Sequence, residues 1–435
     1  MKSTFNRLEK WFVVFAVIFL TGILRWASLF VSPDPMSNSV NMYNPFDPIN
    51  SLIQHAIYAI TLFFLVARPK TTFMASKRSL LIWALLILAV CSFIWSDFPD
   101  WSLRKGITTI QTTYFSVYFA SRFNIKQQVH ILVWALGIVA LFVIAFSLAF
   151  PSSAIETGSN AGALRGPFTQ KNLLARIATL GVIVFLVSLL ERKMSSWFLW
   201  IGLFAQLLIV LLTTSKTALL LLFTIFILIP IYKSLKWKMT VAIPILITAV
   251  LFLAGIAMLV SFNWESYLTA LGRDPGLSGR TGLWEAAIDK IKEKPWIGYG
   301  YQGFWQEGGG ATEIWKQEGY KPPHAHNGYI NIALDLGLVG LFIFLFLIIK
   351  NYIKSIVYLR FSRSSIGLWP LLYITFFGVY NYSENTIIEH NSIFWMLIVS
   401  VVISINNPSR FTAKGADSEV PENYQRPNFD PIGLG

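Results

Sequence analysis

The stretch Val129–Phe150, VHILVWALGIVALFVIAFSLAF, decides the fold class of this chain. Its 22 residues include no Asp, Glu, Lys or Arg. An apolar helix needs roughly 17 to 25 residues to cross a hydrocarbon core about 30 Å thick. The stretch therefore predicts a membrane-spanning helix.

Apolar runs of similar length recur along the whole chain. Its 435 residues are 55% hydrophobic and 13% charged, far more apolar than a soluble protein of this size requires. We expect an all-α polytopic membrane protein with about 12 transmembrane helices. The predicted spans are 11–31, 51–67, 79–95, 106–121, 129–150, 173–190, 197–213, 217–232, 239–261, 328–349, 366–382 and 392–406.

Lys and Arg predict the side of the membrane on which each loop lies, because positively charged flanks are retained in the cytoplasm. With both termini inside, the cytoplasmic segments hold 21 of the 35 basic residues but only 6 of the 22 acidic ones. We expect a multi-pass protein of the bacterial cytoplasmic (inner) membrane with cytoplasmic termini. The net charge of +13 then reflects insertion topology, and no nucleic-acid partner is expected.

Two further features concern processing and covalent links. The first apolar run lacks a small-residue cleavage site, so we expect a retained helix rather than a removed signal peptide. Cys91 is the single cysteine, which excludes a disulfide within the chain.

The long loops all fall on the predicted periplasmic side. They are 32–50, 151–172 and 262–327. We expect residues 1–408 to form the transmembrane domain, including the periplasmic loop 262–327, and residues 409–435 to form a disordered cytoplasmic tail.

The largest of these loops is expected to contain short helices. Apolar spacing predicts an amphipathic helix over Thr281–Lys294, which Pro295 ends, and a second helix over Ala311–Tyr320. His326 follows where the chain re-enters the membrane.

Ionisable side chains within or at the rims of spans are candidates for function, because placing a charge at the bilayer centre costs about 2.5 to 3.5 kcal/mol on insertion scales. Structural explanations exist: Arg280 can pair with Glu285 or Asp289 of its own helix, and His326 can be an ordinary interfacial histidine. Lys216 is harder to explain in this way because it lies in a tight hairpin between two apolar runs. With the polar and aromatic residues beside them, the candidates are Arg165, Lys171, Asn172, Lys216, Arg280, Trp284, His324, His326, Asn327, Glu384 and Glu389.

Motifs of other chemistries are missing from the sequence. It has no HExxH, no CxxC and no phosphate-binding P-loop, and His324 and His326 do not have the spacing of a helical zinc pair. We expect neither a metal nor a cofactor. A cluster of cations with histidine fits an anionic leaving group such as pyrophosphate.

Several motifs resemble those of the O-antigen ligase/polymerase superfamily, in their order and spacing. The resemblance runs from about residue 80 to residue 345. The motifs are Trp95-Ser96, Gly166–Asn172, Ser215–Ala218, Gly279–Trp284, Pro295–Gly300, and His326-Asn327 followed by Gly337–Gly340.

The resemblance implies a GT-C-like fold and a metal-independent, inverting glycosyltransferase. Such enzymes pass a glycan from an undecaprenyl-pyrophosphate donor to an acceptor hydroxyl on the periplasmic side. Lys216 and Arg280 would hold the pyrophosphate, and His326 would stand at the catalytic centre. The residues themselves leave the catalytic base open between His326, Glu384 and Glu389.

Two departures from the ligase pattern favour a polymerase. Ligases carry Arg where Lys216 stands, and Ser or Thr is common where this chain has Leu341. With Ala120–Phe123 and Gly166–Asn172, these positions resemble the exopolysaccharide polymerases of the succinoglycan type, which join lipid-linked repeat units into exopolysaccharide or O-antigen.

Two alternatives remain. One is a ligase that transfers finished glycan to lipid A core or another acceptor, and the other is an inorganic-carbon or solute transporter. Expected partners are the lipid-linked donor, a glycan or lipid acceptor, membrane lipids, a chain-length regulator and a flippase.

Overall fold

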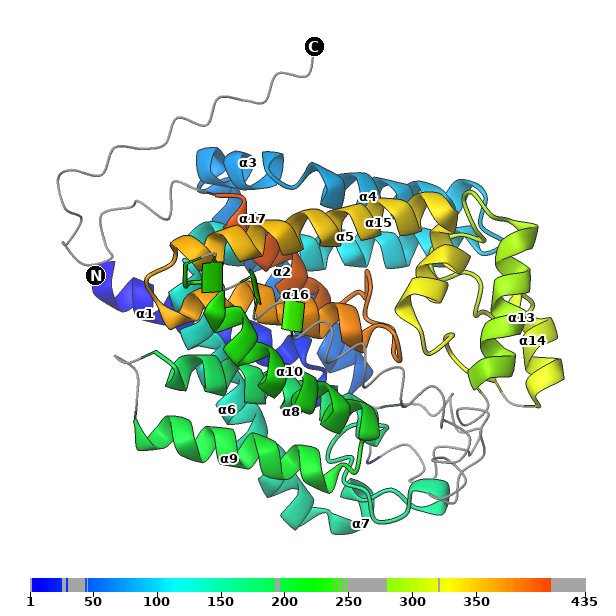
Figure 1. Cartoon of the computed structure of the whole chain (residues 1–435). Helices are drawn as coiled ribbons and strands as arrows, with labels where there is room; N and C mark the ends of the chain where they lie inside the picture. Colours follow the sequence, from blue (N-terminus) through cyan, green and yellow to red (C-terminus); the bar gives the residue numbers. More distant parts are fainter. Residues whose placement is uncertain are drawn as a thin grey trace.

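The structure is a computed structural model that describes residues 2–25, 29, 44, 46–191, 196–238, 240–241, 243–244, 247–248, 280–319 and 321–407. Within these ranges the chain is helical, with one isolated bridge between Ile155 and Leu164 and no strand (Figure 1). The expected all-α fold is confirmed for this part of the protein. The α-helices are α1 (Lys2–Leu20), α2 (Asp47–Val66), α3 (Pro69–Lys77), α4 (Leu80–Cys91), α5 (Pro99–Arg122), α6 (Ile125–Ala149), α7 (Pro151–Ala154), α8 (Lys171–Leu189), α9 (Trp197–Leu212), α10 (Lys216–Ser234), α13 (Arg280–Glu293), α14 (Ala311–Glu318), α15 (Gly328–Phe361), α16 (Leu368–Tyr380) and α17 (Ile393–Ile405).

Five of the described helices are long and apolar enough to cross a membrane: α2, α6, α8, α10 and α15. A sixth span arises if α3 and the segment Leu80–Ile94 are taken together, although the two are bent by 85°. Helices α9, α16 and α17 are apolar but shorter. The membrane character is therefore confirmed, whereas the number of twelve spans stays a prediction.

Some predicted boundaries differ from the observed ones. The first span was expected at 11–31, but α1 begins at Lys2 and ends at Leu20, followed by a short 3-10 turn. The bend between α3 and α4 was not expected. The loop 32–50, the span 239–261, the first part of the loop 262–327 and the tail 409–435 lie wholly or largely outside the described residues.

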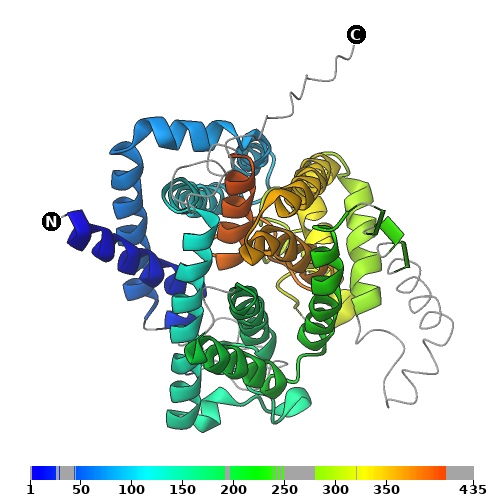
Figure 2. The same cartoon turned by 60° about the vertical axis from the view of Figure 1, so that its left-hand side comes forward.

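Helix α17 forms the centre of the bundle. All of its residues are buried, and it packs against α5, α15 and α16 (Figure 2). A helix that is apolar on every side can be enclosed by other helices or can face lipid, and α17 is enclosed, so it needs no polar face.

The two ends of the bundle differ. At one end, here called the loop end, lie α13 and α14, which confirm the two helices predicted within the largest loop (Figure 1). At the other end, here called the terminal end, α1 begins and α15 finishes. There the buried Glu9 on α1 accepts hydrogen bonds from Arg68 and Arg122, at 2.9 Å each, so that three segments are joined by one carboxylate.

Candidate active site

The segment that follows α13 is bound to a break in α15. Gly337 has φ 66° and ψ −170°, which interrupts the helical hydrogen bonds of α15. The segment 295–300 takes their place. Four backbone bonds join the two: Tyr299 and Gly300 donate to the carbonyls of Leu334 (2.8 Å) and Asp335 (3.0 Å), and Leu338 and Val339 donate to those of Pro295 (2.7 Å) and Trp296 (3.2 Å).

Glycine is required on both sides of this contact. A Cβ atom on Gly337 would lie 2.2 Å from the carbonyl carbon of Trp296, and one on Gly298 would lie 2.4 Å from the carbonyl oxygen of Leu334. The two glycine-containing motifs of the sequence are therefore one structural unit, in which two backbones meet without side chains between them. This unit fixes the large loop against the start of α15.

Trp284 connects α13 to the residue before His326. Its indole nitrogen donates to the carbonyl oxygen of Ala325 (2.8 Å), and its ring packs edge-on against Tyr382 at 5.7 Å. Arg280 is the first residue of α13, one helical turn before Trp284. Its side chain lies outside the described part of the structure.

His326 has an unusual backbone conformation, with φ 49°. Its amide donates to Nδ1 of His324 at 3.1 Å, and the two rings meet edge-on at 4.3 Å. Asn327, the next residue, caps α15 by accepting hydrogen bonds from the amides of Tyr329 and Ile330. The backbone of His326 is thus fixed between His324 and the capped start of α15.

A chain of polar contacts leads from His326 to three other segments. Its Nδ1 atom lies 3.6 Å from Oε2 of Glu384, in the loop after α16. Oε1 of Glu384 accepts from the side-chain amide of Asn172 (3.2 Å), and the oxygen of that amide accepts from Ser215 (3.1 Å). We call these four residues the His326 network. Glu384 is buried and the His326 side chain is 21% exposed, so the network is partly shielded from solvent.

Two lysines lie beside the Ser215 end of this network. Lys171 donates to the hydroxyl of Thr214 at 3.4 Å, which joins the start of α8 to the hairpin before α10. Lys216 is exposed at the first position of α10 and makes no ion pair with any described residue. A fixed positive charge at a helix N-terminus is a favourable place for an anion.

Arg165 is fully buried and serves the loop that precedes α8. Its guanidinium donates to the carbonyls of Ser153 (2.8 Å) and Thr169 (3.2 Å). Glu156, in the same loop, accepts from the amide of Lys171. Arg165 is therefore shielded from solvent within this loop, and its predicted role in substrate binding stays a prediction.

Glu389 and its neighbour form a second cluster. Glu389 lies 3.5 Å from Arg176, and Nε2 of His390 lies 3.0 Å from the ammonium of Lys105. Burial and the charge of Lys105 lower the pKa of His390 to about 3, so its ring is neutral at pH 7. Of the two carboxylate candidates for the base, Glu384 lies beside His326, whereas Glu389 pairs with Arg176.

A metal could be held by three of the candidate residues. His324, His326 and Glu384 each offer one ligand atom, and these atoms lie within 4.8 Å of one another. Two imidazoles and a carboxylate are a donor set that suits zinc. The spacing of His324 and His326 along the chain does not reveal this set, because the third residue, Glu384, comes from the loop after α16.

Sequence reasoning missed Thr214, Ser215, Tyr382 and Gln302 as individual site residues. Ser215 is part of the motif Ser215–Ala218, and this motif could have identified it as a site residue. Tyr382 lies two residues before Glu384, and Gln302 contacts His390 at 3.2 Å, but neither carries a charge that would draw attention.

Comparisons with known proteins agree with the motifs. Residues 201–345 match the O-antigen ligase family. The exopolysaccharide production protein ExoQ of Rhizobium meliloti is 27% identical over 284 residues, which cover 62% of this chain and 64% of that protein. The putative polysaccharide ligases of Rickettsia conorii and Rickettsia felis are 32% and 30% identical over 142 residues, 31% of this chain and 33% of theirs.

These matches are partial. The chain spans less than two thirds of the length of the curated relatives it matches. The resemblance to the O-antigen ligase/polymerase superfamily, including the exopolysaccharide branch, is nevertheless confirmed.

Proposed function

We propose, from the O-antigen ligase match and the His326 network, that this chain is a membrane glycosyltransferase that polymerises lipid-pyrophosphate-linked repeat units. The observation that carries the proposal is the contact of His326 with Glu384. It joins the motif at the start of α15 to Asn172 and Ser215, which belong to two other motifs of the superfamily. A histidine, a buried carboxylate and adjacent cations then lie together at one site.

The reaction requires a base and a place for the leaving group. The acceptor hydroxyl oxygen attacks the anomeric carbon from the face opposite the donor pyrophosphate, and its proton passes to His326. The bond from the anomeric carbon to the phosphate oxygen breaks, and the electron pair leaves with the pyrophosphate. The configuration at that carbon is inverted. No ATP is needed, because the donor bond is already activated.

Glu384 has the position to orient the base. If Nδ1 of His326 carries a proton that faces Glu384, the other ring nitrogen is the one left to accept the acceptor's proton. The present separation of 3.6 Å is longer than a hydrogen bond, and catalytic contacts of this kind tighten when substrate binds. The carboxylate then stabilises the imidazolium that forms.

Lys216, Lys171 and Arg280 are assigned to the pyrophosphate. Lys216 is an exposed cation beside Ser215, and Lys171 lies across the hairpin next to Asn172. Arg280 begins α13, whose Trp284 contacts the residue before His326. Arginine supplies paired donors and lysine a point charge, and both stabilise charge that develops on the leaving group.

A polymerase is preferred over a ligase because Lys216 and Leu341 depart from the ligase pattern, and a longer likeness to a protein named for exopolysaccharide production supports this preference. The likeness to ExoQ covers 284 residues, twice the 142 residues shared with the putative ligases. We place the loop end in the periplasm, which is consistent with the basic residues of the terminal end facing the cytoplasm.

Reconstitution provides the test. The purified protein is placed in proteoliposomes with a synthetic undecaprenyl-pyrophosphate-linked repeat unit, and the products are separated by size. A ladder of lengthened lipid-linked glycans supports the polymerase. Transfer only to an added lipid A core would instead identify a ligase, and no transfer to either acceptor, with solute uptake by the vesicles, would support a transporter.

A further inference from the structure

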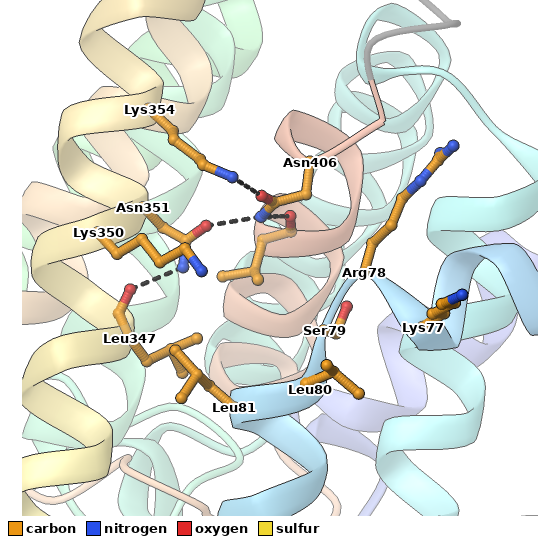
Figure 3. A pocket seen from close by; sticks show the side chains of 11 residues that line it. Lys77, Arg78, Ser79, Leu80, Leu81, Leu347, Lys350, Asn351, Lys354 and Asn406 are labelled. Carbon is orange, nitrogen blue, oxygen red and sulfur yellow. Dashed lines mark hydrogen bonds between the residues drawn. The ribbon is translucent and has the colours of Figure 1, made fainter. Parts of the chain in front are cut away.

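A second polar site lies at the terminal end of the bundle, away from the His326 network. It is a pocket of about 310 Å³ between the end of α15, the corner where α3 meets α4, and the end of α17 (Figure 3). Its floor is apolar, with Leu80, Leu81, Leu347 and Val402. Small-molecule sites occupy roughly 300 to 1,000 Å³, so this volume suits a headgroup rather than a whole lipid.

The charges around the pocket are all of one sign. Lys77, Arg78, Lys350 and Lys354 line it, and no Asp or Glu does. None of the four makes an ion pair with a described residue. Lys350 and Lys354 are also neighbours on one face of α15, where like charges repel. Such a set is stabilised by an anion between the cations.

Uncharged polar groups complete the lining. The side-chain amide of Asn406 donates to Asn351 at 2.8 Å, its oxygen accepts from Lys354, and the amide of Asn351 donates to the carbonyl of Leu347 at 2.7 Å. Figure 3 shows these contacts between α15 and the end of α17. They hold Lys354 in place, while Lys77 and Lys350 remain exposed.

The neighbouring helix indicates where the pocket lies relative to a membrane. Because α3 is bent by 85° from the span that follows it, α3 runs along the bilayer surface if that span crosses the bilayer. Phe73 and Met74 on α3 are 69% and 57% exposed. A short helix with basic residues and exposed apolar side chains is typical of a membrane interface.

We propose that this pocket binds the phosphate of an anionic phospholipid headgroup from the leaflet at the terminal end, the one predicted to be cytoplasmic. The cations recognise the phosphate, the second side-chain N–H of Asn351 offers one hydrogen bond, and the leucines accept the glycerol and first acyl carbons; Asn406, whose amide already donates to Asn351 and Val402, positions Asn351 and Lys354. Basic pockets between membrane helices bind anionic headgroups by this combination. The site is independent of the proposed glycan transfer, and its occupancy is measured without any activity assay.

The test uses the full chain in detergent and measures lipid binding by native mass spectrometry. Phosphatidylglycerol is compared with phosphatidylcholine at equal concentration. The Lys77→Gln/Lys350→Gln variant should bind phosphatidylglycerol roughly 30-fold more weakly, the loss expected for two lysines at an anionic surface. The Lys77→Arg/Lys350→Arg variant should restore binding.

A matched control removes two charges elsewhere. Lys238→Gln/Lys316→Gln changes two exposed lysines outside the pocket and should bind as the wild type does. Equal binding of both lipids by the wild type, or undiminished binding by the Lys77/Lys350 variant, overturns the proposal. Full displacement of the lipid by millimolar inorganic phosphate would assign the pocket to free phosphate and overturn the lipid assignment.

Discussion

The Nδ1 atom of His326 lies 3.6 Å from Oε2 of Glu384, although one residue precedes α15 and the other follows α16. Nδ1 is buried and has no hydrogen-bond partner in the described structure. A buried polar atom without a partner is costly unless the functional state supplies one. The pair is therefore the natural place to test the proposed chemistry.

Removing either member of this pair should lower the rate of glycan transfer. We expect His326→Ala to reduce it by about 10²- to 10⁴-fold, the range for loss of a general base. Glu384→Gln should cost up to about 10⁴-fold, as when the carboxylate that orients a catalytic histidine is replaced by its amide. The rate is measured on the reconstituted protein with the lipid-linked substrate.

The double variant gives the sharper result. If the two residues act as a unit, His326→Ala/Glu384→Gln should be no slower than His326→Ala alone. Glu307→Gln serves as the control, since Glu307 is 74% exposed and pairs with Lys321. Losses that multiply in the double variant would show that the two residues act separately.

Chelation tests whether the ligand set of His324, His326 and Glu384 holds a metal. We expect transfer to survive EDTA, and the purified protein to contain no stoichiometric zinc, because the proposed reaction needs only cations from side chains. Loss of activity on chelation, with recovery on adding zinc, would assign these residues to a metal centre. His324→Ala should then lower the zinc content.

Lys216 is expected to act on donor binding. Lys216→Gln should weaken binding of the lipid-pyrophosphate donor by roughly 10-fold, about the strength of one charge-assisted contact. Lys216→Arg keeps the charge and should be the mildest change. The matched control is Lys292→Gln, an exposed lysine on α13 that pairs with Asp289. Unchanged donor affinity in Lys216→Gln would remove this residue from the pyrophosphate site.

Local sequence pattern was enough to predict most single elements of this fold. Apolar runs predicted the bounds of α2, α6, α8 and α10 to within a few residues. The spacing of apolar residues from Thr281 predicted α13. The period and the length of an apolar run depend only on the residues of one segment. They therefore predict a helix correctly where that segment alone determines where the helix lies.

Local sequence pattern could not predict which residues from different segments contact one another. Glu384 and Glu389 looked equivalent in the sequence, yet one contacts His326 and the other Arg176. Arg165 is predicted to bind substrate, and that role stays a prediction; the sequence did not show that its guanidinium also donates to two backbone carbonyls of its own loop. The bend between α3 and α4 likewise depends on packing against α5 and α15, which no local pattern encodes.

The break in α15 should be sensitive to a single methyl group. Gly337→Ala places a Cβ atom 2.2 Å from Trp296 and forces a positive φ on alanine. We expect a loss of at least about 2 to 3 kcal/mol in the free energy of unfolding, from strain and overpacking together. Gly308→Ala is the matched control: Gly308 also has a positive φ of 83°, but nothing lies within 4 Å of its Cβ position.

Comparing Gly337→Ala with Gly308→Ala separates the cost of the steric contact from the cost of the backbone strain. Gly308→Ala should cost only about 1 kcal/mol, the backbone term alone. Both are measured as shifts of the thermal unfolding midpoint in detergent. Equal shifts in the two variants would mean that the docking of segment 295–300 on α15 contributes little.

The neutral ring of His390 should make the protein sensitive to acid. Burial, and then the charge of Lys105, lower the pKa of His390 to about 3, whereas the unfolded chain has an ordinary histidine pKa near 6.5. The unfolded state therefore takes up a proton as the pH falls below 6.5, and the folded state does not until about pH 3. This contribution to stability is fully present above pH 6.5 and is lost as the pH falls.

At pH 5 the loss should be of the order of 2 kcal/mol, since each pH unit below 6.5 costs about 1.4 kcal/mol. His390→Gln removes the titrating group, so its unfolding midpoint should fall less between pH 7.5 and pH 5 than that of the wild type. His55→Gln, which changes an exposed histidine, should leave the wild-type slope unchanged. Parallel pH curves for wild type and His390→Gln would show that the folded state accepts a proton on His390 as readily as the unfolded chain does.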